Sequence, residues 1–376
     1  MRIAFYAPLK APDHPVPSGD RTIARLLVAA MKQGGAEVEI ASRIRSRISE
    51  PTNGAQEAMA KKGRAAAKRL IGKYRARPKR QRPQAWFTYH LYYKAVDWIG
   101  PQVAEALGIP YFIAEASHAP KRAEGPYGFS HAGAEAAIRA ADGIFCLNPI
   151  DRGCLAPLVG KKRLIDLAPF LDLADFAKGL PERAAMRAKL ARAHGLDVDE
   201  PWLLAIGMMR KGDKLASYRL LAEALQRLDR PWQLLVVGDG EARAEVERAF
   251  KPVAGGVFLL GAQPREKLPE VAAACDLCVW PAVNEAFGMA LLEAQACGLP
   301  VVAGAWGGVP AIIVDGKTGW LSKPGDATEF SADLDFALDA PLVLAGKAAR
   351  ANALAKHDIA GAARTLITTI KKRIEK

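Results

Sequence analysis

The chain has 376 residues, of which half are hydrophobic and a quarter are charged, and its formal net charge is +13. This length suits two domains better than one hydrophobic core, and the composition excludes the disordered and fibrous classes. No segment approaches the roughly 18 uninterrupted apolar residues of a membrane-spanning helix, and residues 1–8 read as a strand rather than a signal peptide. We therefore expect a cytoplasmic protein, at most peripheral on the inner face of the cell membrane.

Short apolar runs alternate with helical patterns through the first half of the chain. The predicted strands are 2–7, 36–41, 85–90, 110–115, 143–147 and 163–168, and the predicted helices are 20–34, 57–76, 97–107, 132–141 and 149–158. Runs rich in β-branched and aromatic residues, separated by helices, favour a parallel sheet covered on both faces.

The second half repeats this alternation. Strands are predicted at 202–207, 232–237, 256–260, 277–281, 300–303 and 319–321, with helices after Gly212, Gly240, Pro264, Ala286 and Asp326. The sequence therefore predicts an α/β protein of two doubly wound Rossmann-like domains, 1–185 and 186–357, with their strand carboxyl ends facing a cleft.

Charge is concentrated in the first half, where residues 1–180 carry 28 Lys plus Arg against 16 Asp plus Glu. Residues 61–82 hold eleven of these cations and no acid, and apolar residues recur at helical spacing on the other side. A basic amphipathic helix of this kind is typical of contact with an anionic membrane surface. A solvated basic face is the main alternative, and we expect no nucleic-acid partner because no nucleic-acid-binding module surrounds the run.

Two glutamates, Glu285 and Glu293, flank a predicted strand-to-helix junction in the second half. The run between them predicts a helix start with exposed backbone N–H groups at Phe287, Gly288, Met289 and Ala290. Such groups hold anions such as a diphosphate, and carboxylates accept hydrogen bonds from sugar or ribose hydroxyls. A ligand that is both a phosphate and a polyol is a nucleotide sugar.

These residues resemble the retaining glycosyltransferases of GT-B family 4, which share a Glu-x7-Glu motif followed by a Cys-Gly-x-Pro-Val-Val-Ala run. Here the run is residues 297–303, and the segments 236–240, 258–261, 307–310 and 315–326 match in order and spacing. The resemblance is strong over 200–330 and weaker, though collinear, before that. It implies the GT-B fold, with the last helix, 358–376, crossing back to the first domain.

The resemblance also implies roles for residues of the second domain. Arg210 and Lys214, with Lys211 as an alternative to Lys214, would neutralise the donor diphosphate. Glu285 would contact the sugar ring, and Glu293 would hold the ribose. Gly261 and Gln263 would meet the base, and no metal or other cofactor would be required. Ala311 stands where the family commonly has Glu, so that turn contributes packing.

The acceptor is expected to bind the first domain, near the small-residue loop formed by Pro17, Ser18, Gly19, Asp20 and Arg21. His118 or Glu115 would take the place of the histidine that the family often has after the fourth strand. His90 and Asp151 border the same predicted opening. In the family mechanism the leaving phosphate accepts the proton of the acceptor hydroxyl, so the protein supplies orientation and electrostatics.

The function predicted on this basis is transfer of a hexose from a UDP- or GDP-sugar, with retained configuration, to a membrane lipid such as diacylglycerol or to a glycolipid or polysaccharide precursor. The alternatives are a soluble-acceptor transferase or sugar synthase of the same fold, and a non-catalytic nucleotide-sugar-binding protein. The sequence does not indicate an oligomeric state.

Overall fold

The computed structural model describes residues 1–16, 18–177 and 179–375, without the side chains of Asn53, Asp175 and Ala177. Pro17 of the predicted acceptor loop lies outside the described residues. The chain divides into two compact units, the first formed by Met1–Ala168 with Ile359–Lys376 and the second by Pro169–Asp358. Residues 169–185, which we assigned to the first domain, therefore fall in the second unit.

The first unit contains a six-stranded parallel sheet in the order β2-β1-β3-β4-β5-β6. Its strands are β1 Arg2–Tyr6, β2 Glu37–Ser42, β3 Ala85–Leu91, β4 Tyr111–Ala116, β5 Gly143–Cys146 and β6 Leu164–Asp166. All six predicted strands are confirmed to within two residues at each end. Phe87 of β3 stacks on Phe5 and Phe145 in the buried centre, with ring centroids 5.9 and 5.8 Å apart.

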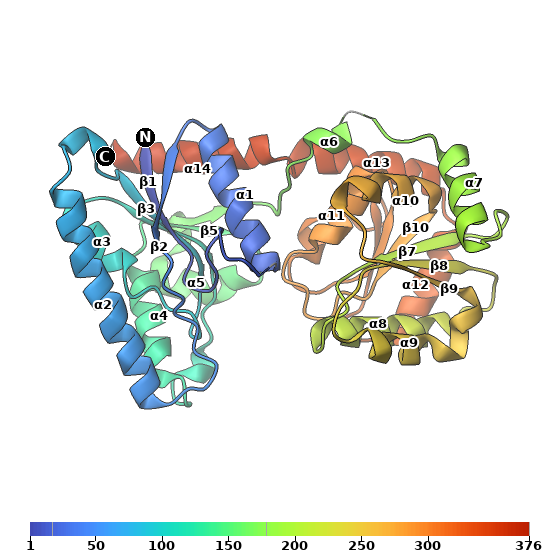
Figure 1. Ribbon diagram of the computed structural model, residues 1–376, viewed down its shortest axis with the longest axis horizontal. Coiled ribbons are helices and arrows are strands. Elements are labelled where there is room, and N and C mark those ends of the chain that lie inside the picture. The colour runs from blue at the N-terminus through green and yellow to red at the C-terminus, as the bar shows by residue number, and fades with distance from the viewer. Residues whose placement is uncertain (17, 178, 376) are drawn as a thin grey trace. The chain divides into compact units, whose positions relative to one another are not determined.

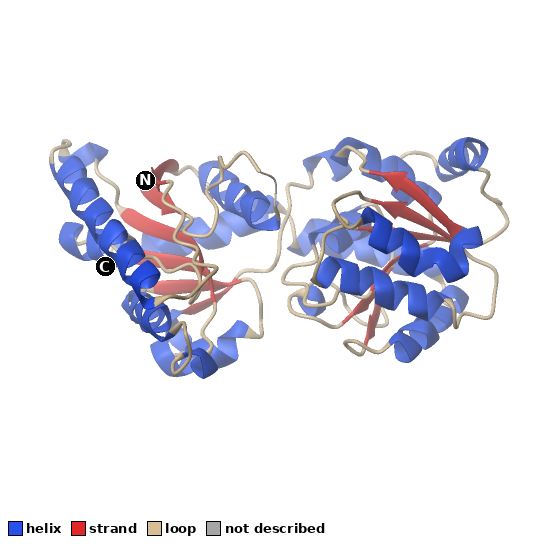
Figure 2. Ribbon diagram, turned by 60° about the horizontal axis from the view of Figure 1, so that its bottom comes forward, coloured by secondary structure: helices blue, strands red, loops and turns tan. Residues whose placement is uncertain are grey.

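Helices cover both faces of this sheet (Figure 2). They are α1 Gly19–Gln33, α2 Asn53–Arg75, α3 Gly100–Leu107, α4 Gly128–Ala140, α5 Asp151–Val159 and α14 Ile359–Ile374, with 3₁₀ turns η1 Lys79–Gln81, η2 Pro120–Arg122 and η3 Lys161–Arg163 (Figure 1). The C-terminal α14 packs on α1 so closely that a Cβ at Gly34 would lie 2.4 Å from Ile367 Cγ1. The last helix is thus part of the first unit.

Helix α2 turns its apolar face inward, against α3 and α4. Ala60, Ala67, Leu70 and Tyr74 are buried, so this face contributes to the core of the unit. A helix that lies in a bilayer surface needs such a face for insertion into the lipid. Any membrane contact of α2 must therefore be made by its outer, cationic face.

The second unit contains another six-stranded parallel sheet, in the order β12-β11-β10-β7-β8-β9. Its strands are β7 Trp202–Ile206, β8 Gln233–Val237, β9 Val257–Gly261, β10 Leu277–Trp280, β11 Val301–Gly304 and β12 Gly319–Ser322. Its helices are α6 Ala174–Ala177, α7 Arg183–His194, α8 Asp213–Leu225, α9 Arg243–Phe250, α10 Leu268–Ala274, α11 Met289–Ala296, α12 Ala327–Asp339 and α13 Leu342–Lys356, with 3₁₀ turns η4 Lys251–Gly256, η5 Arg265–Lys267 and η6 Val309–Ala311. Both sheets have doubly wound strand orders. In sheets of this kind, ligands bind beyond the carboxyl ends of the strands.

Helix α7 was not predicted, because it has no buried apolar residue to produce a helical pattern. The carboxylate of Glu182 caps its first turn by accepting from the N–H groups of Ala184 and Ala185 at 2.9 and 2.6 Å. Arg187 then fixes the helix to the sheet, since its guanidinium lies 4.2 Å from the Trp202 ring centroid and pairs with Asp276 at 3.1 Å.

In the part of the chain that the structure describes, no helix combines the length and the apolar character needed to cross a membrane.

Candidate active site

Four loops meet at the carboxyl edge of the second sheet, one each after β7, β8, β9 and β10. Backbone hydrogen bonds join the first three: Met209 N–H donates to the Asp239 carbonyl and Gly238 N–H to the Gly261 carbonyl, both at 2.9 Å. The fourth loop is tied to α8, because Val283 N–H donates to Ser217 Oγ at 2.9 Å. The loops therefore form one surface at the strand ends.

Glu285 lies on the fourth loop and is hydrogen-bonded to Lys214 of α8. The Lys214 ammonium group is also 5.3 Å from the centroid of the buried Trp280 ring. The loop backbone has positive φ at two non-glycine residues, 56° at Ala282 and 49° at Asn284. Such backbone costs energy and is concentrated at functional sites, where the surroundings hold it in place. Here Asn284 Nδ2 donates to Asp213 Oδ1 at 3.0 Å.

A pair of glycines supports the same loop from behind. A Cβ at Gly307 would lie 2.1 Å from the Glu285 carbonyl oxygen, and one at Gly308 would lie 2.3 Å from that of Ala286. Any side chain at either position would displace the loop that carries Glu285. The segment 307–310, one of those that match the family pattern, therefore has a packing role here.

The loop leads into α11, whose first turn is capped by no side chain among the described residues. Gly288 precedes it with φ 70°, a left-handed conformation that favours glycine. The first N–H groups of a helix have no partner within the helix, and with the helix dipole they favour an anion. Of the residues predicted to offer these groups, Met289 and Ala290 begin the helix, Gly288 is its N-cap and Phe287 precedes it.

Glu293 lies in the second turn of α11, and its side chain is 15% exposed. Arg265 Nε donates to Glu293 Oε1 at 2.7 Å, and Arg265 also bonds the Asp172 carbonyl at 3.1 Å and lies over the Phe176 ring. Burial raises the pKa of Glu293, and Arg265 opposes that effect. Sequence reasoning missed Arg265, because a lone cation 28 residues before its partner gives no local signal.

The remaining predicted donor residues are less enclosed. Lys211 is exposed, whereas Arg210 and Lys214 are half-buried. Gly261 ends β9, and the exposed Gln263 folds back so that its Nε2 donates to the Leu260 carbonyl at 2.7 Å. Of the two lysines considered for the diphosphate, Lys214 is the one in contact with Glu285.

In the first unit, titratable side chains gather at the carboxyl ends of β3 and β4. His90 Nδ1 is 3.2 Å from Asp20 Oδ1, next to Gly19 at the start of α1. His90 and Glu115 both have positive φ, 35° and 57°. Among the described residues, a Cβ at Gly19 would meet no atom within 4 Å outside its chain neighbours and the nearby backbone of its own helix. The predicted acceptor loop therefore borders a charged cluster.

Burial and the charges of neighbouring groups shift the pKa values of these side chains. Burial raises the pKa of Glu115 to about 7, with His90 opposing and Asp151 and Asp20 adding to the rise. Burial alone would lower the pKa of His90, but Glu115 and Asp20, with Asp151, outweigh it and raise that pKa to about 9. Asp151 is fixed by Ser117, whose Oγ donates to its Oδ1 at 2.9 Å. Clusters of this kind are candidate sites of proton transfer or hydroxyl binding.

His118 does not join this cluster. It lies beyond the end of β4 and pairs with Glu135 of α4, with Nε2 3.2 Å from Oε2, and its ring packs on that of His131 at 4.8 Å between centroids. Of the two residues considered after the fourth strand, Glu115 is therefore the one beside His90 and Asp20.

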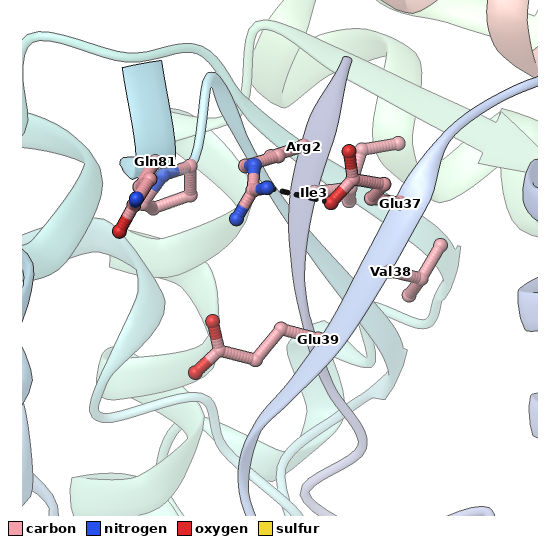
Figure 3. Close-up of a pocket in the computed structure, with 7 residues that line it drawn as sticks. Arg2, Ile3, Glu37, Val38, Glu39 and Gln81 are labelled. Atoms are coloured by element: carbon pink, nitrogen blue, oxygen red, sulfur yellow. Dashed lines mark ion pairs between the residues drawn. The ribbon is translucent and has the colours of Figure 1, made fainter. Parts of the chain in front are cut away.

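Two hollows lie at the opposite, amino-terminal edges of the sheets. One of about 110 Å³ is formed at the starts of β1 and β2, where Arg2 pairs with Glu37 at 2.8 Å (Figure 3). The other, of about 500 Å³, is bordered by Asp197 and Gln233 in the second unit. Both lie away from the strand carboxyl ends where the residues described above converge.

The second unit matches a known family. The profile described as "Glycosyl transferases group 1" covers residues 200–340, which include all four loops and α11. Residues 200–340 are thus similar to the group 1 glycosyl transferases. A relative from Xylanimonas cellulosilytica, D-inositol 3-phosphate glycosyltransferase, is 28% identical over 262 residues, which is 65% of this chain and 62% of that protein. The chain thus spans less than two thirds of this relative's length.

Solved glycosyltransferase structures extend the likeness to the whole fold. Sucrose-phosphate synthase from Thermosynechococcus elongatus has a TM-score of 0.72 at 20% identity, covering 99% of this chain and 98% of that one. Anabaena HepE in complex with UDP-glucose has a TM-score of 0.69 at 16% identity, covering 99% and 100%. The two units therefore have the predicted GT-B fold, and the second contains the domain that matches the group 1 profile. Within that domain, Glu285, Glu293 and the start of α11 are the candidate donor site.

Proposed function

We propose that the protein is a glycosyltransferase that takes a hexose from a nucleotide sugar, with UDP-sugars the first donors to test. The observation that carries the proposal is the placement of Glu285, paired with Lys214, immediately before the uncapped start of α11. This arrangement offers N–H groups to a diphosphate and a carboxylate to a sugar. The UDP-glucose complex of HepE, which has the same fold, supports UDP as the nucleotide.

In this proposal the residues act through charge and position. As the bond between sugar and diphosphate stretches, negative charge grows on the phosphate and positive charge on the sugar. Fixed groups of opposite charge lower the barrier to that separation. Lys214 and Arg210 would stabilise the departing diphosphate, and Glu285 the sugar. Glu293 Oε1 accepts from Arg265, so Oε2 is the oxygen proposed to receive a ribose hydroxyl.

The acceptor is proposed to be a membrane lipid with a free hydroxyl. The support is the outer face of α2, where Lys61, Lys62, Arg64, Lys68 and Arg69 are exposed. Within the described residues none of these five has an ion-pair partner, whereas Lys73 pairs with Glu39 at 2.8 Å. Because the apolar face of α2 is buried, the contact would be electrostatic, at about 1 kcal/mol per cation near an anionic surface.

A soluble phosphorylated polyol is the second candidate acceptor. It is favoured by the name of the Xylanimonas relative, which acts on D-inositol 3-phosphate. Both candidates involve the first unit, where Asp20, His90 and Glu115 would position the acceptor hydroxyl.

The test is a transfer assay with purified protein, a panel of UDP- and GDP-sugars, and two acceptor sets, diacylglycerol in anionic vesicles and inositol phosphates in solution. We expect sugar transfer to one set, with the first-formed product in the donor's anomeric configuration by NMR. Donor binding without transfer or hydrolysis would indicate the non-catalytic alternative. An inverted product would contradict the retaining reaction.

A further inference from the structure

A second cluster of titratable side chains lies in the first unit, apart from Asp20, His90 and Glu115. His118 comes from the loop after β4, and His131 and Glu135 stand one turn apart on α4. One nitrogen of each imidazole and one oxygen of the carboxylate all lie within 4.8 Å of one another. The acceptor role proposed above for Asp20, His90 and Glu115 does not use this trio, of which only His118 was expected to take part in the transferase reaction.

The spacing of these atoms is close to that of a metal site. A tetrahedral ion with bonds of about 2.0–2.1 Å holds its ligand atoms roughly 3.3 Å apart. The separation of His118 Nε2 and Glu135 Oε2 is 3.2 Å, which already fits. No separation in the trio exceeds 4.8 Å, so closure on an ion requires a contraction of at most about 1.5 Å, within reach of side-chain rotation.

The environment of His131 supports a metal site independently of the spacing. The residue is 4% exposed, and its buried Nε2 has no hydrogen-bond partner within the described residues. A buried polar atom without a partner costs about 1–3 kcal/mol and calls for a specific explanation. An imidazole nitrogen beside a second histidine and a carboxylate is explained by a shared cation.

Glu135 is already oriented for monodentate binding. Arg139 donates to its Oε1 through Nε at 2.9 Å and Nη2 at 2.7 Å, so Oε2 is directed to His118. Metal-binding carboxylates are commonly held by such outer hydrogen bonds. The Glu135 side chain is also 29% exposed, which gives an ion and a water ligand a path from solvent.

We propose that His118, His131 and Glu135 bind a divalent transition-metal cation, with Zn²⁺ the best match. Two imidazoles and one carboxylate suit borderline cations such as Zn²⁺, whereas Mg²⁺ and Ca²⁺ prefer oxygen ligands. The site belongs to the first unit, whereas the donor motifs, for which we expect no metal, belong to the second. A bound ion would fasten the segment after β4 to α4, next to Ser117, which holds Asp151.

The experiment is a Zn²⁺ titration by calorimetry of the full chain after treatment with a chelator, together with the change in Tm on adding Zn²⁺. We expect one ion per chain and a higher Tm, since a ligand of the folded state stabilises it. His118→Ala should weaken binding at least about 100-fold and Glu135→Gln at least about 10-fold, because even outer partners of a metal ligand contribute 10–100-fold. The matched control is His194→Ala, which removes an exposed histidine at the end of α7.

Glu135→Gln keeps the size of the side chain and guards against a loss of binding that reflects unfolding. The proposal is supported if the wild type and His194→Ala bind Zn²⁺ equally while folded Glu135→Gln and His118→Ala bind more weakly. It is overturned if the wild type does not bind Zn²⁺, or if the folded variants bind it as tightly as the wild type.

Discussion

Lys214 donates a hydrogen bond to Glu285 Oε2, and this contact joins the first turn of α8 to the loop that leads into α11. The two charges meet beside the helix start proposed to receive a diphosphate. Glycosyl transfer separates charge at this kind of position, so each member of the pair has a partner in the proposed transition state.

Replacing Glu285 by Gln should lower kcat by about 100-fold or more, a typical effect of losing one group that stabilises a transition-state charge. The side chains of the pair are 18% and 30% exposed, so the ion pair contributes only about 1 kcal/mol or less to stability. The Tm should therefore fall by no more than roughly 4 °C. Initial rates with the best donor and a thermal melt check both values.

Glu223→Gln is the matched control for this change, because Glu223 lies on the exposed side of α8 and pairs with Arg227 at 2.9 Å. It should leave turnover unchanged. If the kcat of Glu285→Gln is within twofold of the wild-type value, Glu285 has no role in the reaction.

Replacing Arg265 by Met should change how donor affinity depends on pH. Burial raises the pKa of Glu293 and Arg265 opposes the rise, so its removal should raise that pKa further. The carboxylate form of Glu293 is the one that accepts hydrogen bonds from ribose hydroxyls. As the solution is acidified, the variant should therefore lose UDP affinity at a higher pH than the wild type does. UDP titrations between pH 8 and pH 5, each normalised to pH 8, measure this shift.

Lys267→Met provides the comparison, since Lys267 belongs to the same 3₁₀ turn but pairs with Glu270 at 2.7 Å. Its pH profile should follow that of the wild type. Superimposable profiles for Arg265→Met and the wild type would show that Arg265 does not control the protonation of Glu293.

The pair of His90 and Glu115 should make the protein less stable as the pH rises. Both folded-state pKa values, about 9 and about 7, are above the ordinary values of 6.5 and 4.5. Each group therefore binds its proton more tightly in the folded chain than in the unfolded chain. The stability that each contributes is fully present below its ordinary pKa and is lost as the pH rises through its folded-state pKa. Urea unfolding at pH 6 and pH 9 should show that the free energy of unfolding falls more in the wild type than in the double variant His90→Asn, Glu115→Gln.

Asn is chosen at position 90 because it tolerates the positive φ found there. His194→Asn, at an exposed site, should keep the pH dependence of the wild type. If the double variant loses as much stability between pH 6 and pH 9 as the wild type does, the two groups are not coupled as the structure indicates.

Neutralising the outer face of α2 should abolish binding to anionic vesicles. Five replacements by Gln, at Lys61, Lys62, Arg64, Lys68 and Arg69, remove on the order of 5 kcal/mol of attraction. Flotation with phosphatidylglycerol vesicles at low salt should recover the wild type and not the variant. Because the apolar face of α2 is buried, high salt should also release the wild type.

The control for vesicle binding replaces five exposed cations elsewhere, Lys161, Lys162, Arg192, Lys371 and Lys372. It should float like the wild type. Equal recovery of the α2 variant, or no recovery of the wild type, would exclude α2 as the membrane-contacting surface.

The strands of both sheets could be predicted because each is a short apolar run between helical patterns, as in β8 Gln233–Val237. The order of the motifs around Glu285 and Glu293 likewise indicated a likeness to glycosyltransferases, which the match over residues 200–340 bears out. Helix α7 could not be predicted from an apolar stripe, because Arg187 attaches it to the sheet instead. The pattern of α2 predicted an amphipathic helix, but periodicity alone does not say whether its apolar face meets lipid or the protein's own core.

Parts of the candidate sites depend on contacts between distant segments. The approach of Arg265 to Glu293 and the left-handed backbone at His90 and Glu115 have no signature in local sequence. The same holds for His118, which was proposed as a catalytic residue and which the structure places against His131 and Glu135. Its role in the reaction stays a prediction.

The most direct test of the account is a calorimetric titration of UDP and of GDP into the wild type, Glu293→Gln and the control Glu223→Gln. The account predicts one nucleotide site per chain, weakened at least about tenfold by Glu293→Gln, since a lost charged hydrogen bond costs about 1.5–3 kcal/mol, and unchanged in Glu223→Gln. Absence of binding to either nucleotide, or equal affinities in all three proteins, would contradict the claim that this unit holds a nucleotide sugar at Glu293 and the start of α11.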